Sequence, residues 1–441
     1  MVSVAAAAAS SGGRLKGLTI LRFAHTCGDG GGLERYLLDL NRALGERNQL
    51  TTIQVELSYD RHRLAEQTQI YNGCRLKKIP LFAEPAPQTT DTAKSHNDWL
   101  IKLKDRFIEQ VLCSWPVYQV FTRNYLKRRR VPRRSGEPEG AGLKVQEIIK
   151  KYKVDLIVLH SSGGADASEI IEHATAASVP VAMVYHFSND RLAGLSLRQQ
   201  ISRIAGVAGV CAVDVPHYLS GRFWNLSDGI DTEFYRPENV HPLSRQYSAP
   251  ILLLPARITP SKGQADLLKV AACLKRRGIR TTVVFAGRVD SPAFENELRQ
   301  MAIDEELAGD VEFVGQLDPE QLRDWYAAAA VMVFPTRHHE GLGRVSVEAQ
   351  AMGLPPVVYA IGGTPESILH RKTGFLIPLG DVQGMTNAVE TLLRDDSLRA
   401  VMSQAGRRFA AEKFSLSALA ERHEDYYLKI LSGQRPRQAV N

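Results

Sequence analysis

Short apolar runs recur along the first half of the chain, and stretches with helical periodicity separate them. Most of these runs are apolar throughout rather than alternating, which is typical of parallel strands buried on both faces of a sheet. The pattern therefore predicts a doubly wound α/β domain. The runs are LTILRFA (18–24), TIQVEL (52–57), DLIVL (155–159), VAMVY (181–185) and VAGVCAV (207–213).

A second series of apolar runs begins after the polar, proline-bearing stretch from Glu238 to Pro250. Helical patterns again separate the runs, so the sequence predicts a second doubly wound domain and a linker near residues 236–249. In such folds ligands bind at the carboxyl ends of the strands, here expected in a cleft between the two domains. The runs are ILLL (251–254), TTVVFA (281–286), VEFV (311–314), VMVF (331–334) and PVVY (356–359).

The length of 441 residues fits this division, because single hydrophobic cores stop growing at roughly 250–300 residues. We expect two Rossmann-like domains, preceded by a disordered lead and followed by a helix, near 416–431, that packs back on the first domain. The expected parts are a lead (1–14), a first domain (15–238) with an insert (about 82–142), a second domain (239–414), and a C-terminal helix and tail (415–441).

Composition narrows the class of protein. An apolar share of 44% and a charged share of 23% are those of a soluble globular chain, and no apolar run approaches the ~20 residues that span a bilayer. Five scattered cysteines without a C-x-x-C pair indicate reduced thiols and no zinc site. The net charge of +7 suits anionic substrates or an anionic membrane surface. We expect a cytoplasmic protein, either free or peripheral on the inner face of the membrane, that does not bind nucleic acid.

A glycine-rich turn, HTCGDGGGLERYL, lies between the first strand and the first helix. It is not a P-loop, because Leu33-Glu34 stand where Lys and Ser or Thr are needed, and Leu33 also breaks the dinucleotide fingerprint. The bare N–H groups of Gly31 and Gly32 at a helix start could bind an anion. A tight turn without a ligand explains the same residues.

The segment RHHEGLGRVSVEAQAMG places Glu340 and Glu348 on either side of seven residues. If a helix begins near Gly343, Glu340 lies in the preceding turn and Glu348 about one and a half turns in. The first could then accept bonds from sugar hydroxyls and the second from both ribose hydroxyls. The N–H groups of Gly341, Leu342 and Gly343 could meet a phosphate between them. Two solvated glutamates on a surface helix are the alternative.

Two cations, Arg257 and Lys262, follow the strand that ends at Leu254 in the stretch PARITPSKG. Cations at this edge of a sheet suit a diphosphate, although two solvated loop residues would look the same. The chain has no D-x-D motif to hold Mg²⁺. We therefore expect no metal or other cofactor, with Arg and Lys neutralising the leaving group.

Several motifs in order resemble the retaining GT-B glycosyltransferases of family four, glycosyl transferases group 1, whose hallmark is E-x7-E. The resemblance covers nearly the whole chain and implies two Rossmann-like domains, with the acceptor in the first and a nucleotide-sugar in the second. The motifs are GGGLE (30–34), NLSDGIDTEFYRP (225–237), the Arg257 and Lys262 loop, Glu340-x7-Glu348, GGTPE (362–366) and TGFLIP (373–378).

The resemblance also implies roles for the site residues. Arg257 and Lys262 would hold the donor diphosphate, and Glu348 the ribose. Glu340 would hold the transferred sugar together with the backbone of 341–343. Gly31 and Gly32 would approach the donor from the opposite lip of the cleft.

His186, in VYHF, matches a histidine that similar enzymes place near the reacting carbon, although a histidine beside a strand end is more often structural. The family is thought to retain configuration by a front-face displacement, in which the leaving phosphate accepts the acceptor's proton. The two glutamates are therefore not expected to act as a hydrolase's acid and base. Three features depart from the family pattern: Ala256 replaces a usual glycine, Pro355-Pro356 replaces a single proline, and Arg344 stands where an apolar residue is common.

The insert carries a strong basic run, RNYLKRRRVPRR (123–134), after an amphipathic stretch over 98–115. Such a run could dock on anionic lipid, at about 1 kcal/mol for each basic residue near the surface. A core-facing helix followed by a solvated basic loop explains the pattern equally well. Membrane docking would suit a lipid-linked acceptor.

The sequence thus predicts a metal-independent retaining glycosyltransferase. It would transfer a hexose from a UDP- or GDP-sugar to a sugar hydroxyl of an envelope polysaccharide or its lipid-linked precursor. Two alternatives stay open. One is a nucleotide-sugar epimerase or a phosphorylase on the same architecture. The other is a catalytically inactive subunit that binds the donor or a partner.

Overall fold

The computed structural model of the protein describes residues 14–24, 32–48, 50–56, 67–71, 74–80, 141–160, 165–186, 201–213, 215, 219, 222–244 and 246–433. Most of the glycine-rich turn, the amphipathic stretch over 98–115 and the basic run over 123–134 lie outside these ranges. Met1–Leu81 and Val145–Asn441 form one compact unit, which holds both sheets described below.

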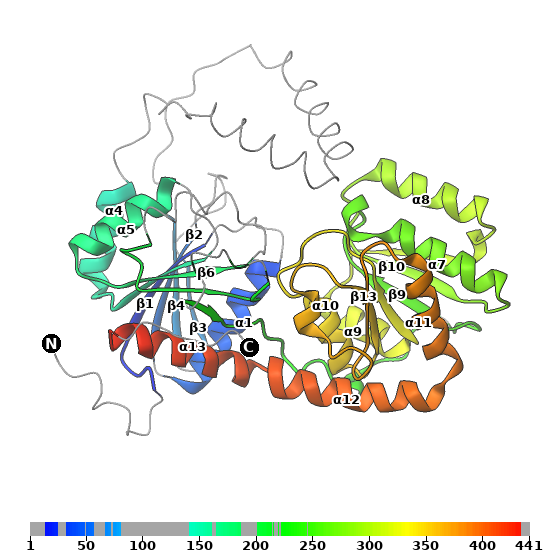
Figure 1. The fold of residues 1–441 in the computed structure, drawn as a ribbon. Helices are drawn as coiled ribbons and strands as arrows, with labels where there is room; N and C mark the ends of the chain where they lie inside the picture. Colours follow the sequence, from blue (N-terminus) through cyan, green and yellow to red (C-terminus); the bar gives the residue numbers. More distant parts are fainter. Residues whose placement is uncertain are drawn as a thin grey trace, which may run out of the picture. The chain divides into compact units, whose positions relative to one another are not determined.

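The first sheet has eight strands in the order β3-β4-β2-β1-β5-β6-β7-β8 (Figure 1). All neighbouring pairs are parallel except β3 and β4, which form an antiparallel pair at one edge. Helices α1 (Gly32–Arg47), α4 (Ala141–Tyr152) and α5 (Ala165–Ala176) accompany it. Its strands are β1 (Thr19–Ala24), β2 (Thr51–Glu56), β3 (Gln67–Tyr71), β4 (Cys74–Pro80), β5 (Leu156–His160), β6 (Val181–Tyr185), β7 (Gly206–Gly209) and β8 (Phe223–Asn225).

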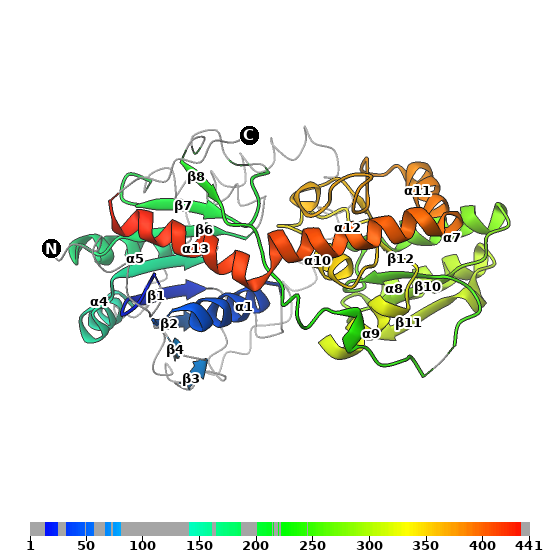
Figure 2. The same ribbon diagram turned by 90° about the horizontal axis from the view of Figure 1, so that it is seen from below.

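The second sheet is parallel throughout and has six strands in the order β11-β10-β9-β12-β13-β14 (Figure 2). Its strands are β9 (Ile251–Pro255), β10 (Thr282–Ala286), β11 (Val311–Gly315), β12 (Val331–Phe334), β13 (Pro356–Tyr359) and β14 (Phe375–Ile377). Its helices are α7 (Gln264–Arg276), α8 (Pro292–Asp304), α9 (Pro319–Ala328), α10 (Arg344–Ala351), α11 (Val382–Arg394) and α12 (Asp396–Phe414). Two parallel-type sheets confirm the predicted α/β architecture.

The core of the second sheet follows from its apolar runs. Strand β9 is buried along its whole length, and α7 buries Leu267, Leu268 and Leu274 against it. These three leucines recur at helical spacing, so one face of α7 is apolar and packs on the sheet while its lysines and arginines face water. Burial of each leucine contributes about 2 kcal/mol to folding.

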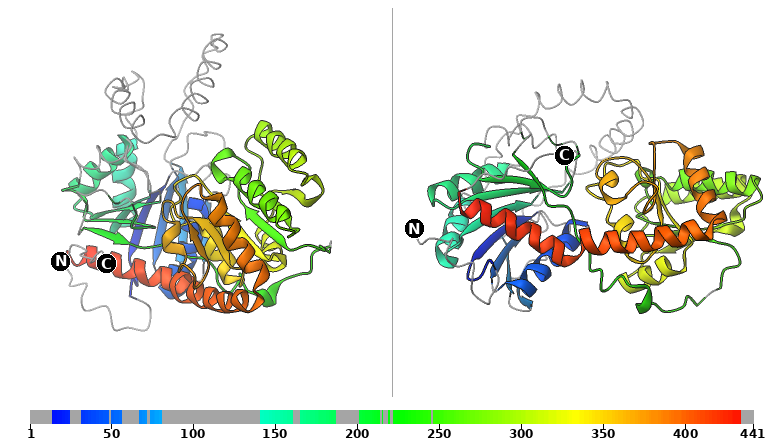
Figure 3. Two further views of the ribbon diagram at one scale, coloured as in Figure 1. Left: turned by 45° about the vertical axis from the view of Figure 1, so that its right-hand side comes forward. Right: turned by 60° about the horizontal axis from the view of Figure 1, so that its bottom comes forward.

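The last helix, α13 (Leu416–Leu431), packs on the first sheet, although the chain reaches it from the second (Figure 3). Leu419, Tyr426 and Ile430 are buried in one cluster with residues of β1, β5 and α1. Just before the helix, the Ile230 N–H donates to the Phe414 carbonyl at 2.8 Å. The two segments of chain that connect the sheets are therefore bonded to each other.

Gly263 is a position where only glycine fits. Its φ is +78°, and a Cβ added there would lie 1.9 Å from the carbonyl oxygen of Pro335. We predict that Gly263→Ala lowers the free energy of unfolding by about 3 kcal/mol or more. Gly278 has a similar φ of +77° but open space around it, so Gly278→Ala isolates the backbone cost and should lose only about 1 kcal/mol. Chemical unfolding of both variants measures this, and equal losses would contradict the predicted clash.

Candidate functional site

The carboxyl ends of three neighbouring strands of the second sheet, β9, β12 and β13, carry the predicted site. Arg257 and Lys262 follow β9, the segment 335–343 follows β12, and GGTPE (362–366) follows β13. Parallel strands end at the same edge of a sheet, so these loops meet there. The donor residues predicted on the second domain are therefore brought to one edge.

Lys262 is placed by a short 3₁₀ turn, η5 (Pro260–Lys262), which ends at the left-handed Gly263. The Arg337 N–H donates to the Ser261 carbonyl at 2.8 Å and so ties this turn to the loop after β12. Held in this way, Lys262 lies 5.7 Å above the ring of Phe334. The ammonium group is fixed against the strand edge rather than free in solvent.

Lys262 and Glu340 form an ion pair, with the Nζ of Lys262 donating to Oε1 of Glu340. Only 13% and 17% of these side chains are exposed. Thr336 donates its hydroxyl to the same carboxylate oxygen at 3.0 Å. Glu340, predicted to bind the sugar, and Lys262, predicted to bind the diphosphate, thus neutralise each other's charge where little of either side chain is exposed.

The backbone after Glu340 packs too closely for side chains. A Cβ on Gly341 would lie 2.3 Å from the His186 carbonyl oxygen, and one on Gly363 would lie 1.7 Å from the Gly341 carbonyl oxygen. Leu342 is buried, and Gly343 has a φ of +79° as it leads into α10. These glycines let three loops approach one another at the start of the helix.

Glu348 lies on α10 and is 6% exposed. The Tyr326 hydroxyl donates to its Oε2 at 3.1 Å, and the Nε of Arg344 lies 3.8 Å from Oε1. Burial and the nearby Glu348 carboxylate raise the pKa of Tyr326 well above its usual value, so its hydroxyl stays a donor. Glu348 is thus a buried, oriented carboxylate and not a solvated surface glutamate.

Arg257 differs from Lys262, because 56% of its side chain is exposed and it pairs with Asp290. The same carboxylate accepts from the Nε of Arg288 at 3.0 Å. A diphosphate that binds Arg257 must therefore compete with Asp290.

We predict that Asp290→Asn raises nucleotide affinity by up to about fivefold, because exposed ion pairs are worth about 0–1 kcal/mol. Titration calorimetry with a nucleoside diphosphate measures the change. Asp310 pairs with Arg280 at 2.7 Å on another part of the same sheet, so Asp310→Asn is the matched control and should change nothing. Weaker binding by Asp290→Asn would show instead that Asp290 orients Arg257 for the ligand.

The side chain of His186 points into the first sheet's core. Its Nε2 lies 2.9 Å from Nδ1 of His160, and its ring meets the ring of Tyr36 edge-on at 4.6 Å. Burial lowers the pKa of His186 to about 3, so the imidazole is neutral at ordinary pH. The backbone carbonyl of His186 lies against Gly341 of the Glu340 loop. Its catalytic role stays a prediction.

The predicted site in the glycine-rich turn lies partly outside the residues that the structure describes. Gly31 lies outside these residues, and Gly32 is the first residue of α1. Within the described residues no group of three or more His, Cys, Asp or Glu side chains could hold a metal ion. No helix in the same part of the chain is long and apolar enough to cross a membrane.

Sequence reasoning missed several residues at this edge. Thr336 and Tyr326 orient the two glutamates, and Asp290 competes for Arg257. Glu366, noted only as part of GGTPE, accepts bonds from the Ala212 N–H at 2.6 Å and the Asn225 side chain at 2.7 Å. Apart from Thr336, which lies four residues before Glu340, their partners are distant in the sequence, so no local motif reveals those contacts.

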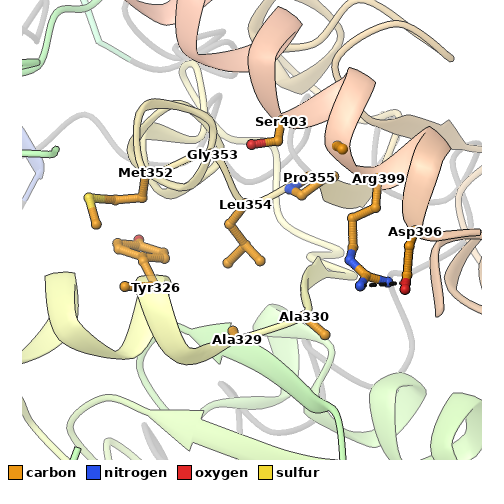
Figure 4. Close-up of a pocket in the computed structure, with 12 residues that line it drawn as sticks. Tyr326, Ala329, Ala330, Met352, Gly353, Leu354, Pro355, Asp396, Arg399 and Ser403 are labelled. Atoms are coloured by element: carbon orange, nitrogen blue, oxygen red, sulfur yellow. Dashed lines mark ion pairs between the residues drawn. The ribbon is translucent and has the colours of Figure 1, made fainter. Parts of the chain in front are cut away.

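A hollow of about 280 Å³ lies elsewhere on the second sheet's helices (Figure 4). Tyr326, Met352 and Leu354 line one part of it, and an ion pair of 2.7 Å between Arg399 and Asp396 lies at another. None of the predicted donor residues lines it. It shares Tyr326 with the Glu348 contact but is a separate feature.

Comparison with known families gives a match for the part of the chain that holds the second sheet. A model of the family described as glycosyl transferases group 1 matches residues 236–409, which hold the second sheet and the site described above. This region therefore resembles the glycosyl transferases group 1 family. The matched region contains Arg257, Lys262, Glu340 and Glu348.

Curated relatives agree with this assignment. One is a GDP-mannose-dependent alpha-(1-6)-phosphatidylinositol monomannoside mannosyltransferase of Mycolicibacterium smegmatis, 33% identical over 222 residues, or 48% of this chain and 56% of the relative. Another is a D-inositol 3-phosphate glycosyltransferase of Streptomyces avermitilis, 30% identical over 236 residues, or 51% of this chain and 50% of the relative. The chain thus spans about half the length of the curated relatives it matches.

Solved structures match over nearly the whole chain. A glycosyltransferase from Rickettsia africae has a TM-score of 0.65 at 18% identity and covers 94% of this chain and 98% of its own. Anabaena HepE, solved with UDP, has a TM-score of 0.67 at 16% identity and covers 93% and 100%. The likeness shows a two-domain GT-B fold, in which the matched region forms the second domain.

Proposed function

We propose that the protein is a retaining glycosyltransferase that transfers a hexose from a UDP- or GDP-sugar to a sugar hydroxyl. The acceptor would be an envelope polysaccharide or its lipid-linked precursor. The observation that carries the proposal is the sheltered Lys262–Glu340 pair, which lies at the strand edge just before the helix that holds the buried Glu348. A cation for the diphosphate and two oriented carboxylates for the sugars are the groups that a nucleotide-sugar requires.

The donor would enter a site whose charges are already balanced. Lys262 is shared with Glu340, and Arg257 with Asp290. The donor diphosphate would draw both cations toward itself, and Glu340 would then be free to accept bonds from hydroxyls of the transferred sugar. Backbone N–H groups at the start of the eight-residue α10 would add donors for the phosphates.

Glu348 would accept both ribose hydroxyls. Its carboxylate is already oriented by Tyr326 and lies one helical turn from Arg344, so little ordering remains when the nucleotide binds. Because Glu348 is buried, a neutral residue with the same shape would keep the fold but lose one acceptor. In this arrangement Glu340 would bind the transferred sugar and Glu348 the ribose of the same donor.

The reaction would be a front-face displacement. The acceptor oxygen forms a bond to the anomeric carbon as the bond from that carbon to the diphosphate oxygen breaks, on the same face of the sugar. The acceptor's proton passes to the leaving diphosphate, so no side chain has to accept it. Arg257 and Lys262 would stabilise the charge that grows on the leaving group, which is why we propose that no metal is needed.

The names of the relatives support a nucleotide-sugar donor and a lipid-linked acceptor, but they do not distinguish a GDP-sugar from a UDP-sugar. The mycobacterial relative is named for GDP-mannose and a phosphatidylinositol mannoside, and the Anabaena structure holds UDP. Both bases therefore remain in the proposal. A lipid-linked acceptor would place the protein on the inner face of a membrane.

The basic run over 123–134 is our proposed contact with that membrane. Co-sedimentation with vesicles that contain anionic lipid tests it, using a variant in which Arg128, Arg129 and Arg130 are replaced by alanine. Loss of binding by the variant supports the proposal. Binding that survives the substitutions would contradict it.

Thermal unfolding with saturating UDP, GDP and ADP, each with and without Mg²⁺, tests the proposed function. A ligand at about 100 times its Kd stabilises the folded state by about 2.7 kcal/mol. We expect stabilisation by UDP or GDP that does not depend on Mg²⁺. No stabilisation by any of them would favour the inactive subunit, and a strict need for Mg²⁺ would contradict metal independence.

A further inference from the structure

Arg344, the residue where an apolar side chain is common in the family, is the centre of a buried ionic cluster. It is the first residue of α10, and only 13% of its side chain is exposed. One terminal nitrogen donates to Asp39 at 2.6 Å, and the other donates to Asp228 at 2.8 Å and to the Gly229 carbonyl at 2.8 Å. Every terminal nitrogen of this guanidinium group is thus engaged.

These partners belong to distant parts of the fold. Asp39 lies on α1, about two turns after the helix begins at Gly32. Asp228 and Gly229 lie in the segment that leaves β8 and leads to the second sheet. A single side chain at the amino end of the donor helix therefore contacts the first helix and the connecting segment.

The connecting segment is held from its other side as well. Arg422 of α13 donates to the carbonyls of Leu226 and Asp228, the latter at 3.1 Å. A Cβ on Gly229 would lie 2.8 Å from Leu419 of the same helix. Because the segment is fixed between α13 and Arg344, it is a firm anchor for the amino end of α10.

The carboxylates of this cluster compensate the cost of burying the Arg344 charge. Burial disfavours the charge of Arg344, but Asp228, Asp39 and Glu348 outweigh it and raise the pKa of the guanidinium. Removing the arginine would leave Asp39 and Asp228 without their shared partner in a sheltered place, which is costly. The cluster is therefore expected to hold one arrangement rather than several.

We propose that Arg344 is a positioning residue that fixes α10, and with it Glu348, against α1 and the connecting segment. This inference rests on the proposed function, because it takes Glu348 to be the ribose ligand. Arg344 does not need to touch the nucleotide. It sets where Glu348 lies, and it makes that position depend on Asp39, a residue of the other sheet's first helix.

Calorimetric titration with UDP and GDP tests this on the full chain. We expect Arg344→Met to weaken affinity for the nucleotide that wild type binds by about tenfold, and Asp39→Asn to weaken it in the same direction. The Arg344→Met/Asp39→Asn double variant should lose no more than Arg344→Met alone, because both changes break one contact. Arg344→Lys, which keeps the charge but not the forked geometry, should recover part of the loss.

The exposed Arg394, which pairs with Glu390 one turn away on α11, offers a matched control, so Arg394→Met should bind like wild type. Circular dichroism shows whether each variant is folded, and Asp39→Asn keeps the test open if Arg344→Met does not fold. Unchanged affinity in Asp39→Asn, or additive losses in the double variant, would overturn the proposal. If wild type itself binds neither nucleotide, the proposed function fails before this inference is reached.

Discussion

Lys262→Met is expected to lower kcat/KM for the nucleotide-sugar by about 100- to 1,000-fold, because it removes a preorganised cation that stabilises the leaving diphosphate. Lys262 should matter more than Arg257. Its side chain is 13% exposed and fixed by the η5 turn, whereas Arg257 is exposed and can be replaced in part by solvent. Steady-state kinetics with a donor and acceptor that wild type uses measures the loss.

Lys269 provides the control for this substitution. It lies one element later, on α7, and 51% of its side chain is exposed. Lys269→Met removes the same charge from the same sheet and should leave kcat/KM within about twofold of wild type. If Lys262→Met and Lys269→Met are equally mild, Lys262 does not stabilise the leaving group.

Acid is expected to destabilise the first sheet's core through three buried histidines. Burial lowers the pKa of His160, His186 and His423, that of His186 to about 3. In an unfolded chain each would titrate near its ordinary pKa of about 6.5. Below that pH each histidine is protonated in the unfolded state but not in the folded state. The free energy of unfolding therefore falls as pH falls, until the pH reaches the pKa of the histidine in the folded protein.

The size of the effect follows from proton linkage. Between about pH 7.5 and about pH 5.5 His186 alone costs about 1.4 kcal/mol of unfolding free energy, and His160 and His423 add to the loss in the same direction. Asp228, whose pKa is raised by burial against the opposing charge of Arg344, acts in the opposite sense. Chemical unfolding across this range measures the sum.

Single substitutions separate the histidines from other acid effects. His423 lies in the core, where its Nε2 lies 2.7 Å from the Tyr36 hydroxyl, so His423→Gln should reduce the pH-dependent loss. His241 is 81% exposed, and His241→Gln should leave the loss unchanged. A pH dependence that His423→Gln does not alter would show that other groups cause it.

Long apolar runs predicted most of the central strands. The runs at 181–185 and 356–359 coincide with β6 and β13. The edge strand β3 and its neighbour β4 were missed because their residues are mixed in polarity, as in CRLKKIP. Burial on both faces leaves a clear apolar signal, whereas an edge strand keeps a polar face and resembles a loop.

The site was predictable where one stretch of chain carries it. Glu340, the glycines after it and Glu348 lie within one loop and helix, so their spacing was enough to place them. The partners of Arg344 could not be predicted, because Asp39 and Asp228 come from distant segments that only the fold brings together. The direction of the His186 ring was equally hidden, since a sequence does not show which face of the strand end is buried.

The central claim is that the chain transfers a sugar from a nucleotide donor without a metal ion. Incubation of the full chain with labelled GDP-mannose or UDP-glucose and a membrane lipid extract, in the presence of EDTA, tests it most directly. We predict that label passes from one donor into an acceptor fraction, and that Lys262→Met abolishes most of the transfer while Lys269→Met does not. Absence of transfer from both donors, or transfer that Lys262→Met leaves intact, would contradict it.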